Sequence, residues 1–135
     1  MEAPGYPKKA FSMLGKCLVT LALLASSTLA AQAAGDPVKG QAVYKRCVVC
    51  HTIDKNGGDA LGPNLFGIVG RKAGTRPGYA YSAPLKASNI VWTEANLTKW
   101  SASPGRMVPG TKMFFAGITS KTQQADLTAY LKTLK

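Results

Sequence analysis

The sequence predicts an all-α domain in which a few short helices are joined by long loops. Near the C-terminus, apolar residues recur at helical spacing, at Leu127, Tyr130, Leu131 and Leu134. No segment alternates apolar and polar residues as a half-buried strand does, and no internal repeat is present. Residues 52–81 contain nine glycines and prolines. This composition predicts a loop much longer than ordinary connections, and a loop of that length needs something to wrap.

The N-terminal segment differs in composition from the rest and predicts a cleavable export signal. Its opening residues are polar and basic, an uncharged apolar run begins at Cys17, and small residues follow up to Ala34. That order is typical of secretory signal peptides, and Ala31-Gln32-Ala33 fits the small-residue cleavage rule. The alternative is an uncleaved membrane anchor, since the uncharged segment reaches the lower limit of roughly 17–25 residues for a spanning helix. Its weakly apolar second half favours a signal peptide at 1–33 and a mature domain at 34–135.

The mature domain is strongly basic. Residues 1–33 hold three of the 17 Lys and Arg and one of the six Asp and Glu, which leaves the mature domain with a net charge of +9. Such a balance indicates an acidic partner surface, an anionic membrane or nucleic acid. Export from the cytoplasm removes nucleic acid as the natural partner, and we expect no stable membrane insertion after cleavage.

The first helix is predicted to begin at Asp36-Pro37. An Asp side chain caps free backbone N–H groups at a helix start, and Pro is well tolerated in the first turn. Val38, Ala42 and Val43 follow as a short apolar stripe, and the helix leads directly to Cys47.

Three further helices are predicted after the long loop. Residues 82–89 form a short one, and Thr93 begins another that continues through Trp100 and ends before Pro104. Residues 103–117 are expected to be irregular. The last helix begins near Ser120, where Gln123 completes a possible capping box. The expected architecture is three main helices plus short ones.

Cys47-Val-Val-Cys50-His51 is the central motif of the chain. The order C-x-x-C-H is typical of c-type haem attachment, in which two thiols add to the two vinyl groups of one haem and the histidine ligates the iron. A C-x-x-C pair can also be a redox pair or half of a zinc site. The mature domain has no further Cys or His for zinc and no βαβ pattern for a thioredoxin-like pair. The motif therefore predicts one covalent haem c.

The second axial ligand of such an iron must come from another residue type, because His51 is the only histidine. Met107 and Met113 are the remaining soft ligands of the mature domain, and thioether sulfur suits haem iron. Met113 lies in a Pro- and Gly-containing segment and is followed by two phenylalanines that can pack on a porphyrin. We favour Met113 as the ligand and core packing for Met107.

The mature domain resembles a known family, the class I cytochromes c, which include mitochondrial cytochrome c and its close bacterial relatives. The resemblance covers residues 35–135 and extends well beyond the haem motif. The segments that match in order and spacing are Gly62-Pro63-Asn64-Leu65, Gly70-Arg71-Lys72, Pro77-Gly78-Tyr79-Ala80-Tyr81, Trp92, residues 109–117 and residues 126–132.

The resemblance implies the cytochrome c fold, with the helices and long loops wrapped around the haem. It implies that the Pro63 carbonyl accepts the far N–H of His51, and that Gly40 and Tyr44 cross the last helix near Leu127 and Tyr130. The other implied pocket residues are Arg71, Tyr81 and Trp92 at the propionates, Thr111 in the methionine loop, and Leu65, Tyr79, Trp92, Trp100 and Phe115 as walls.

The chain departs from the family at Trp100, where the family usually has a Tyr whose hydroxyl is bonded to the Met sulfur. Indole is larger and offers only a donor N–H. The resemblance therefore does not carry over the hydrogen bond to Met113, and the reduction potential is expected to shift.

The function that the resemblance implies is one-electron transfer in the periplasm, not enzymatic catalysis. Arg46, Arg106 and Lys112 match the basic ring that orients acidic redox partners, and the carrier is expected to be a monomer. The implied partners are a quinol–cytochrome c reductase as donor and a terminal oxidase or photosynthetic reaction centre as acceptor. Two alternatives remain open, namely a haem peroxidase or oxidase with an open iron, and a dedicated acceptor for one periplasmic dehydrogenase.

Overall fold

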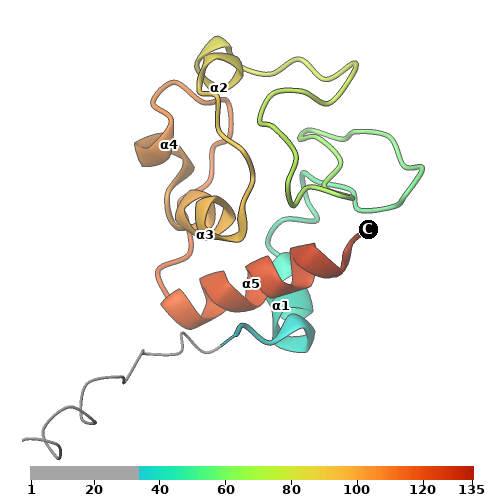
Figure 1. Ribbon diagram of the computed structural model, residues 1–135, viewed down its shortest axis with the longest axis vertical. Helices are drawn as coiled ribbons and strands as arrows, with labels where there is room; N and C mark the ends of the chain where they lie inside the picture. Colours follow the sequence, from blue (N-terminus) through green and yellow to red (C-terminus); the bar gives the residue numbers. More distant parts are fainter. Residues whose placement is uncertain (1–33) are drawn as a thin grey trace, which may run out of the picture. The chain divides into compact units, whose positions relative to one another are not determined.

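The computed structural model describes residues 34–135. The predicted signal peptide at 1–33, with its cleavage site and the membrane-anchor alternative, lies outside the described residues. The helices are α1 (Pro37–Tyr44), α2 (Ala83–Ala87), α3 (Glu94–Ala102), α4 (Pro104–Met107) and α5 (Lys121–Thr133), and long loops connect them (Figure 1). Residues 34–135 contain no strand, only the isolated bridge between Lys72 and Val91. The prediction of an all-α domain with long loops is confirmed.

The helix starts follow the capping residues that the sequence contains. The Asp36 carboxylate accepts the N–H groups of Val38 and Lys39 at the start of α1. The hydroxyls of Thr93 and Ser120 accept backbone N–H groups in the same way at the starts of α3 and α5. These bonds satisfy donors that have no partner inside a helix. The predicted starts of the three main helices are therefore confirmed to within one residue.

Two of the local predictions are wrong. The segment after α3 is not wholly irregular, because Pro104 begins the short helix α4, where its missing N–H costs nothing. On α1, Val38 and Ala42 face solvent, and the side chain of Val38 is 76% exposed. The buried face of α1 is instead Gly40, Val43 and Tyr44. A contact between helix backbones decides the orientation of α1, which an apolar stripe alone does not reveal.

Helices α1 and α5 cross at close range on the side of the domain away from α2 and α4 (Figure 1). A Cβ atom at Gly40 would lie 2.0 Å from the Asp126 carbonyl oxygen, so only glycine fits at the crossing. Beside it, the rings of Tyr44 and Tyr130 pack with their centroids 5.5 Å apart. Leu127 and Leu131 of α5 are buried in the core that this crossing closes. None of the described helices is both long and apolar enough to cross a bilayer.

The Tyr44 hydroxyl donates a hydrogen bond of 2.8 Å to the His51 carbonyl, and burial raises its pKa from 10.0 to about 12. Because the folded-state pKa is the higher one, this stabilisation is complete below about pH 10 and is lost as the pH rises toward 12. We expect Tyr44→Phe to lower stability by roughly 1–2 kcal/mol at pH 7. Denaturant unfolding of both proteins at pH 7 to 12 tests this, and the variant should lose less of its stability above pH 10. Parallel losses in the two proteins would contradict the prediction.

Candidate haem site

A cavity of about 560 Å³ lies among α3, α5 and the long loops. Its lining includes Cys47, Cys50 and His51 from the motif, together with Met113 from the loop before α5. Met107 does not line the cavity and packs against the core instead. The structure thus brings the attachment residues and the favoured axial methionine together at one site.

The motif residues are positioned by a turn that continues α1. The N–H of Cys47 donates to the Tyr44 carbonyl at 2.7 Å, and the N–H groups of Cys50 and His51 donate to the Cys47 carbonyl at 3.0 and 2.9 Å. Residues three apart on such a turn share a face, which places both thiols toward the cavity that they line. Burial raises the pKa of the Cys47 thiol.

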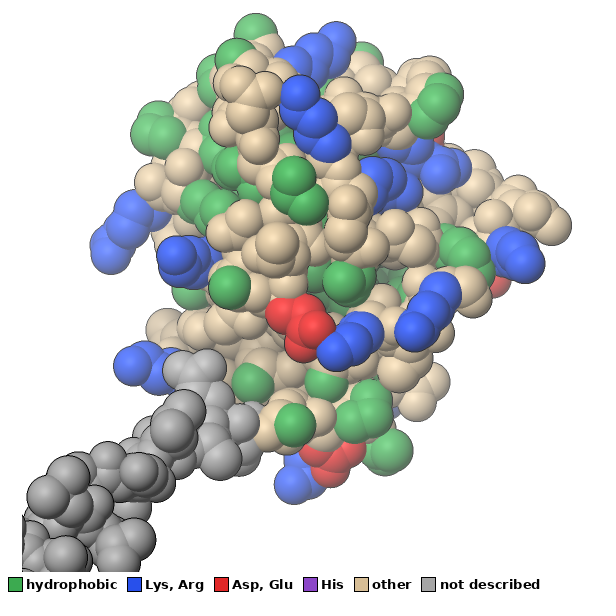
Figure 2. Space-filling view, viewed as in Figure 1, with side chains coloured by type: hydrophobic (Ala, Val, Ile, Leu, Met, Phe, Trp, Pro, Cys, Tyr) green, Lys and Arg blue, Asp and Glu red, His purple; other side chains and the backbone are tan. Residues whose placement is uncertain are grey.

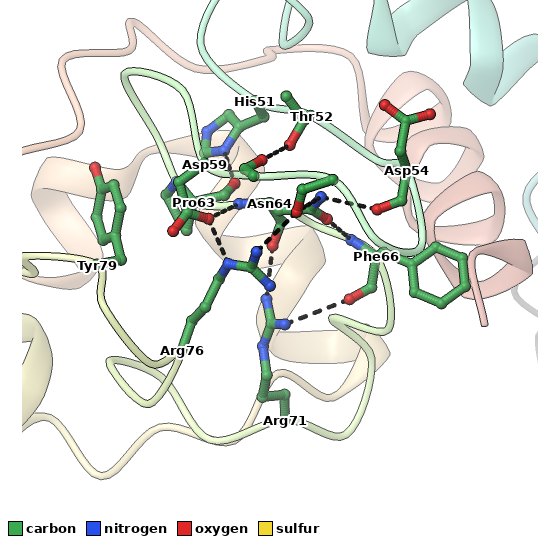
Figure 3. Close-up of polar contacts among 12 residues, drawn as sticks. His51, Thr52, Asp54, Asp59, Pro63, Asn64, Phe66, Arg71, Arg76 and Tyr79 are labelled. Atoms are coloured by element: carbon green, nitrogen blue, oxygen red, sulfur yellow. Dashed lines mark hydrogen bonds and ion pairs between the residues drawn. The ribbon is translucent and has the colours of Figure 1, made fainter.

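The His51 imidazole is held by the loop behind it. Its Nδ1 lies 2.7 Å from the Pro63 carbonyl oxygen (Figure 3). A proton on Nδ1 satisfies that carbonyl and leaves the lone pair of Nε2 for a metal. Burial lowers the pKa of His51, which favours the neutral imidazole that a metal requires. A Cβ at Gly62 would lie 2.5–3.0 Å from the imidazole atoms, so glycine is needed for the loop to approach the ring.

The Met113 side chain is held from two directions. The Trp100 indole N–H donates to the Met113 sulfur at 3.2 Å. The Met113 backbone N–H donates to the Thr111 hydroxyl at 3.3 Å, and the turn before it needs the positive φ of Gly110. The family's hydrogen bond to the Met sulfur, which the resemblance alone did not predict here, is therefore made by the Trp100 indole N–H.

One polar atom inside the cavity has no partner within the described domain. The Ser82 hydroxyl is buried without a hydrogen bond, and Ser82 lines the cavity beside Tyr81. An unpartnered buried hydroxyl is costly, and the carboxylate of a haem propionate would satisfy it. Sequence reasoning missed Ser82 because it precedes α2 in the position of a cap, although its side chain makes no capping bond.

The other predicted pocket residues divide into two groups. Tyr81 and Trp92 line the cavity, but Arg71 does not. The Arg71 guanidinium donates instead to the carbonyls of Asn64 at 3.0 Å and Phe66 at 3.3 Å. The remaining predicted residues that line the cavity are Arg46, Pro63, Leu65, Tyr79, Trp100, Thr111, Lys112 and Phe115, whereas Arg106 does not line it.

These residues fit a covalently bound haem. Two thiols, an imidazole and a thioether line one largely apolar cavity, and its lining includes Ser82, whose buried hydroxyl has no partner in the described domain. The family model described as Cytochrome c matches residues 37–135. The chain belongs to the cytochrome c family. Like other cytochromes c it carries haem c covalently, and Cys47, Cys50 and His51 occupy the attachment motif.

Several relatives of this cytochrome c agree with that assignment. It is 43% identical over 122 residues to cytochrome c2 of Rhodomicrobium vannielii, covering 90% of this chain and 92% of that protein. It is 50% identical over 99 residues to cytochrome c of Theileria annulata, covering 73% of this chain and 85% of that protein. The solved structure of cytochrome cH from Methylobacterium extorquens matches with a TM-score of 0.68 and 46% identity, covering 73% of this chain and 99% of that one. The cytochrome c fold is thereby confirmed, and the protein is an electron carrier.

The Trp100 hydrogen bond predicts a measurable effect on the reduction potential. The positive end of the N–H dipole lies at the Met113 sulfur, and with that sulfur as the predicted ligand of the iron it would disfavour the more positive ferric state. We expect Trp100→Phe to lower the potential by a few tens of millivolts, the equivalent of one neutral hydrogen bond of about 1 kcal/mol. Voltammetry of the holoprotein tests this. Trp100→Tyr keeps a donor and should recover part of the shift, and equal potentials in all three proteins would contradict the prediction.

Proposed function

We propose that this cytochrome c is a periplasmic one-electron carrier between membrane-bound or soluble redox complexes, with His51 and Met113 as the axial ligands. The observation that carries the proposal is the placement of Cys47, Cys50, His51 and Met113 around one cavity. When bound there, haem c supplies an iron that alternates between the ferrous and ferric states. A haem peroxidase or oxidase needs an open iron position, which the Met113 sulfur would occupy.

The protein's contribution is to keep both ligands fixed and the cavity dry. Pro63 holds the imidazole, while Trp100 and Thr111 hold the methionine. Because both ligands come from anchored residues, a change of one electron requires little movement of the protein. The apolar walls exclude water, which would otherwise reorganise around the changed charge.

The partner is expected to present an apolar centre with acidic flanks. Val49, Leu61 and Phe114 line the cavity, and they are 75%, 79% and 99% exposed. Arg46 and Lys112 are the only charged residues among the described residues that line it. Lys and Arg also far outnumber acidic side chains on the face seen in Figure 2. We propose Arg46, Arg106 and Lys112 as docking residues for a quinol–cytochrome c reductase as donor and for a terminal oxidase or reaction centre as acceptor, with the carrier acting as a monomer.

Electron transfer to host membranes tests the docking surface. Purified reduced protein is mixed with membrane vesicles from the host, and its oxidation is followed optically at several salt concentrations. We expect rapid oxidation that slows with salt, and a several-fold slower rate for Arg46→Glu. Lys45→Glu changes the same charge at the neighbouring residue, which does not line the cavity, and should have a smaller effect. Equal rates for the two variants would contradict the proposed surface.

Two further measurements test the site and the export. The mass of the intact exported protein shows whether one haem is attached and whether residues 1–33 have been removed. The optical spectrum of the oxidised protein shows whether both axial positions are filled. A high-spin spectrum would favour the enzyme alternative over the carrier.

A further inference from the structure

The Pro63 carbonyl that accepts His51 Nδ1 belongs to a peptide unit that is held at both ends. The Pro63 carbonyl and the Asn64 N–H lie in one plane, because the peptide bond that joins them does not rotate freely. A group that holds the N–H therefore also holds the carbonyl. The carbonyl faces His51 at 2.7 Å, and the Asn64 N–H donates to an Asp59 carboxylate oxygen at 2.7 Å. Asp59 therefore acts on the orientation of the carbonyl that holds the imidazole (Figure 3).

Asp59 is itself fixed by a residue that lies 17 positions later in the same long connection between α1 and α2. It forms an ion pair with the Arg76 guanidinium, which also donates to the Gly57 carbonyl at 3.0 Å. The pair lies at the surface of the domain, with 22% of the Asp59 side chain and 24% of the Arg76 side chain exposed. Burial acts to raise the pKa of Asp59, but the Asn64 N–H and Arg76 outweigh it and hold that pKa below its usual value. Asp59 is therefore charged at neutral pH.

The remaining groups of Asn64 have other partners. Its side-chain amide donates to the carbonyls of Asp54 at 2.9 Å and Gly57 at 3.0 Å, and its carbonyl accepts from Arg71. Of the groups of Asn64, only the backbone N–H donates to the Asp59 carboxylate. Several hydrogen bonds thus stabilise the loop around Asn64. The Pro63–Asn64 peptide, whose carbonyl accepts from His51, is held on its N–H side by Asp59.

We propose that Asp59, locked by Arg76, is a positioning residue that orients and polarises the Pro63–Asn64 peptide against the axial ligand His51. Hydrogen bonds in a chain polarise one another. When the Asp59 carboxylate accepts the Asn64 N–H, the Pro63 carbonyl of the same peptide becomes a stronger acceptor. It then draws the Nδ1 proton of His51 more strongly, so the imidazole becomes richer in electrons. An electron-rich ligand favours the ferric state. The inference rests on the proposed role of His51 as an axial ligand, and it assigns a tuning function to two residues outside the cavity lining.

The test compares substitutions at Asp59 with one at Glu94 in the holoprotein. Glu94→Gln is the matched control, because it also removes one negative charge and one ion pair. That ion pair joins Glu94 of α3 to Lys132 of α5. The readouts are the reduction potential and the hydrogen-exchange rate of His51 Nδ1–H, measured by NMR. Neither readout needs a partner protein, so a failure of the docking proposal leaves both measurable.

We expect Asp59→Ala to speed exchange of His51 Nδ1–H by roughly three- to tenfold, the factor that corresponds to losing part of one hydrogen bond. The potential should rise at the same time. Asp59→Asn keeps a neutral acceptor and should give an intermediate result, and it serves as the test if the alanine variant does not fold. Glu94→Gln should leave the exchange rate unchanged.

Two outcomes would overturn the inference. If the Asp59 variants lose only stability, with exchange and potential matching those of Glu94→Gln, Asp59 has a structural role alone. If the unmodified protein shows no His51 signal shifted by the haem, the ligand assignment is wrong and the inference is lost with it.

Discussion

Replacement of Met113 by alanine is expected to lower the reduction potential by on the order of 0.1 V or more, given that axial ligands set haem potentials over a range of about 0.8 V. Met113 lines the cavity, and its sulfur accepts the Trp100 indole N–H. A thioether is a soft ligand that favours ferrous iron, so its loss favours the ferric state. The variant should also lack the absorption band expected from the proposed bond between the iron and the Met113 sulfur.

Met107→Ala provides the matched control for this prediction. Met107 is the other methionine of the described domain, and it packs against the core without lining the cavity. Its removal should cost stability and leave the potential nearly unchanged. Voltammetry and absorption spectra of both holoproteins check the prediction. A large shift for Met107→Ala with none for Met113→Ala would show that the ligand had been assigned to the wrong residue.

The features that the sequence predicted well depend on short-range signals. Cys47, Cys50 and His51 lie on one turn, so their spacing alone brings them together. Asp36, Thr93 and Ser120 cap helices through contacts with residues two or three positions away. These interactions are completed within a few residues, which is why they can be inferred without the fold.

The features that the sequence did not indicate depend on how the irregular segments fold. Arg71 stays a predicted propionate partner, and the sequence did not indicate that its guanidinium also donates to the carbonyls of Asn64 and Phe66. Ser82 has the sequence position of a helix cap, and only the cavity shows that its hydroxyl is unpartnered. The pairing of Asp59 with Arg76 spans 17 positions inside the long connection between α1 and α2, which contains no helix or strand. No periodic pattern indicates which residues of such a loop meet.

The buried face of α1 shows how one backbone contact can override an apolar pattern. Val38 and Ala42 suggested the buried stripe, yet both are exposed. Gly40 faces α5, and the two helices approach so closely there that no side chain fits. The resemblance implied this crossing, whereas the hydrophobic pattern of α1 did not.

Gly40→Ala is expected to destabilise the protein by about 3 kcal/mol or more, within the range of severe steric substitutions. Intrinsic helix propensity alone predicts the opposite sign, since alanine is favoured over glycine in a helix by about 1 kcal/mol. The added Cβ would lie 2.0 Å from the Asp126 carbonyl oxygen and 2.7 Å from the Tyr130 Cβ. A backbone oxygen cannot rotate away as a side chain can, so α1 and α5 must separate.

Gly105→Ala separates the effect of packing from that of propensity. Gly105 lies in α4, and a Cβ there would meet no atom within 4 Å. We expect this variant to be neutral or slightly stabilised, while Gly40→Ala unfolds at a much lower denaturant concentration. Equilibrium denaturant unfolding of the two holoproteins gives both values. If Gly40→Ala were as stable as the unmodified protein, the close approach of α1 and α5 would be wrong. The different outcomes expected for one chemical change follow from the distance between the backbones of α1 and α5, which helix propensity does not describe.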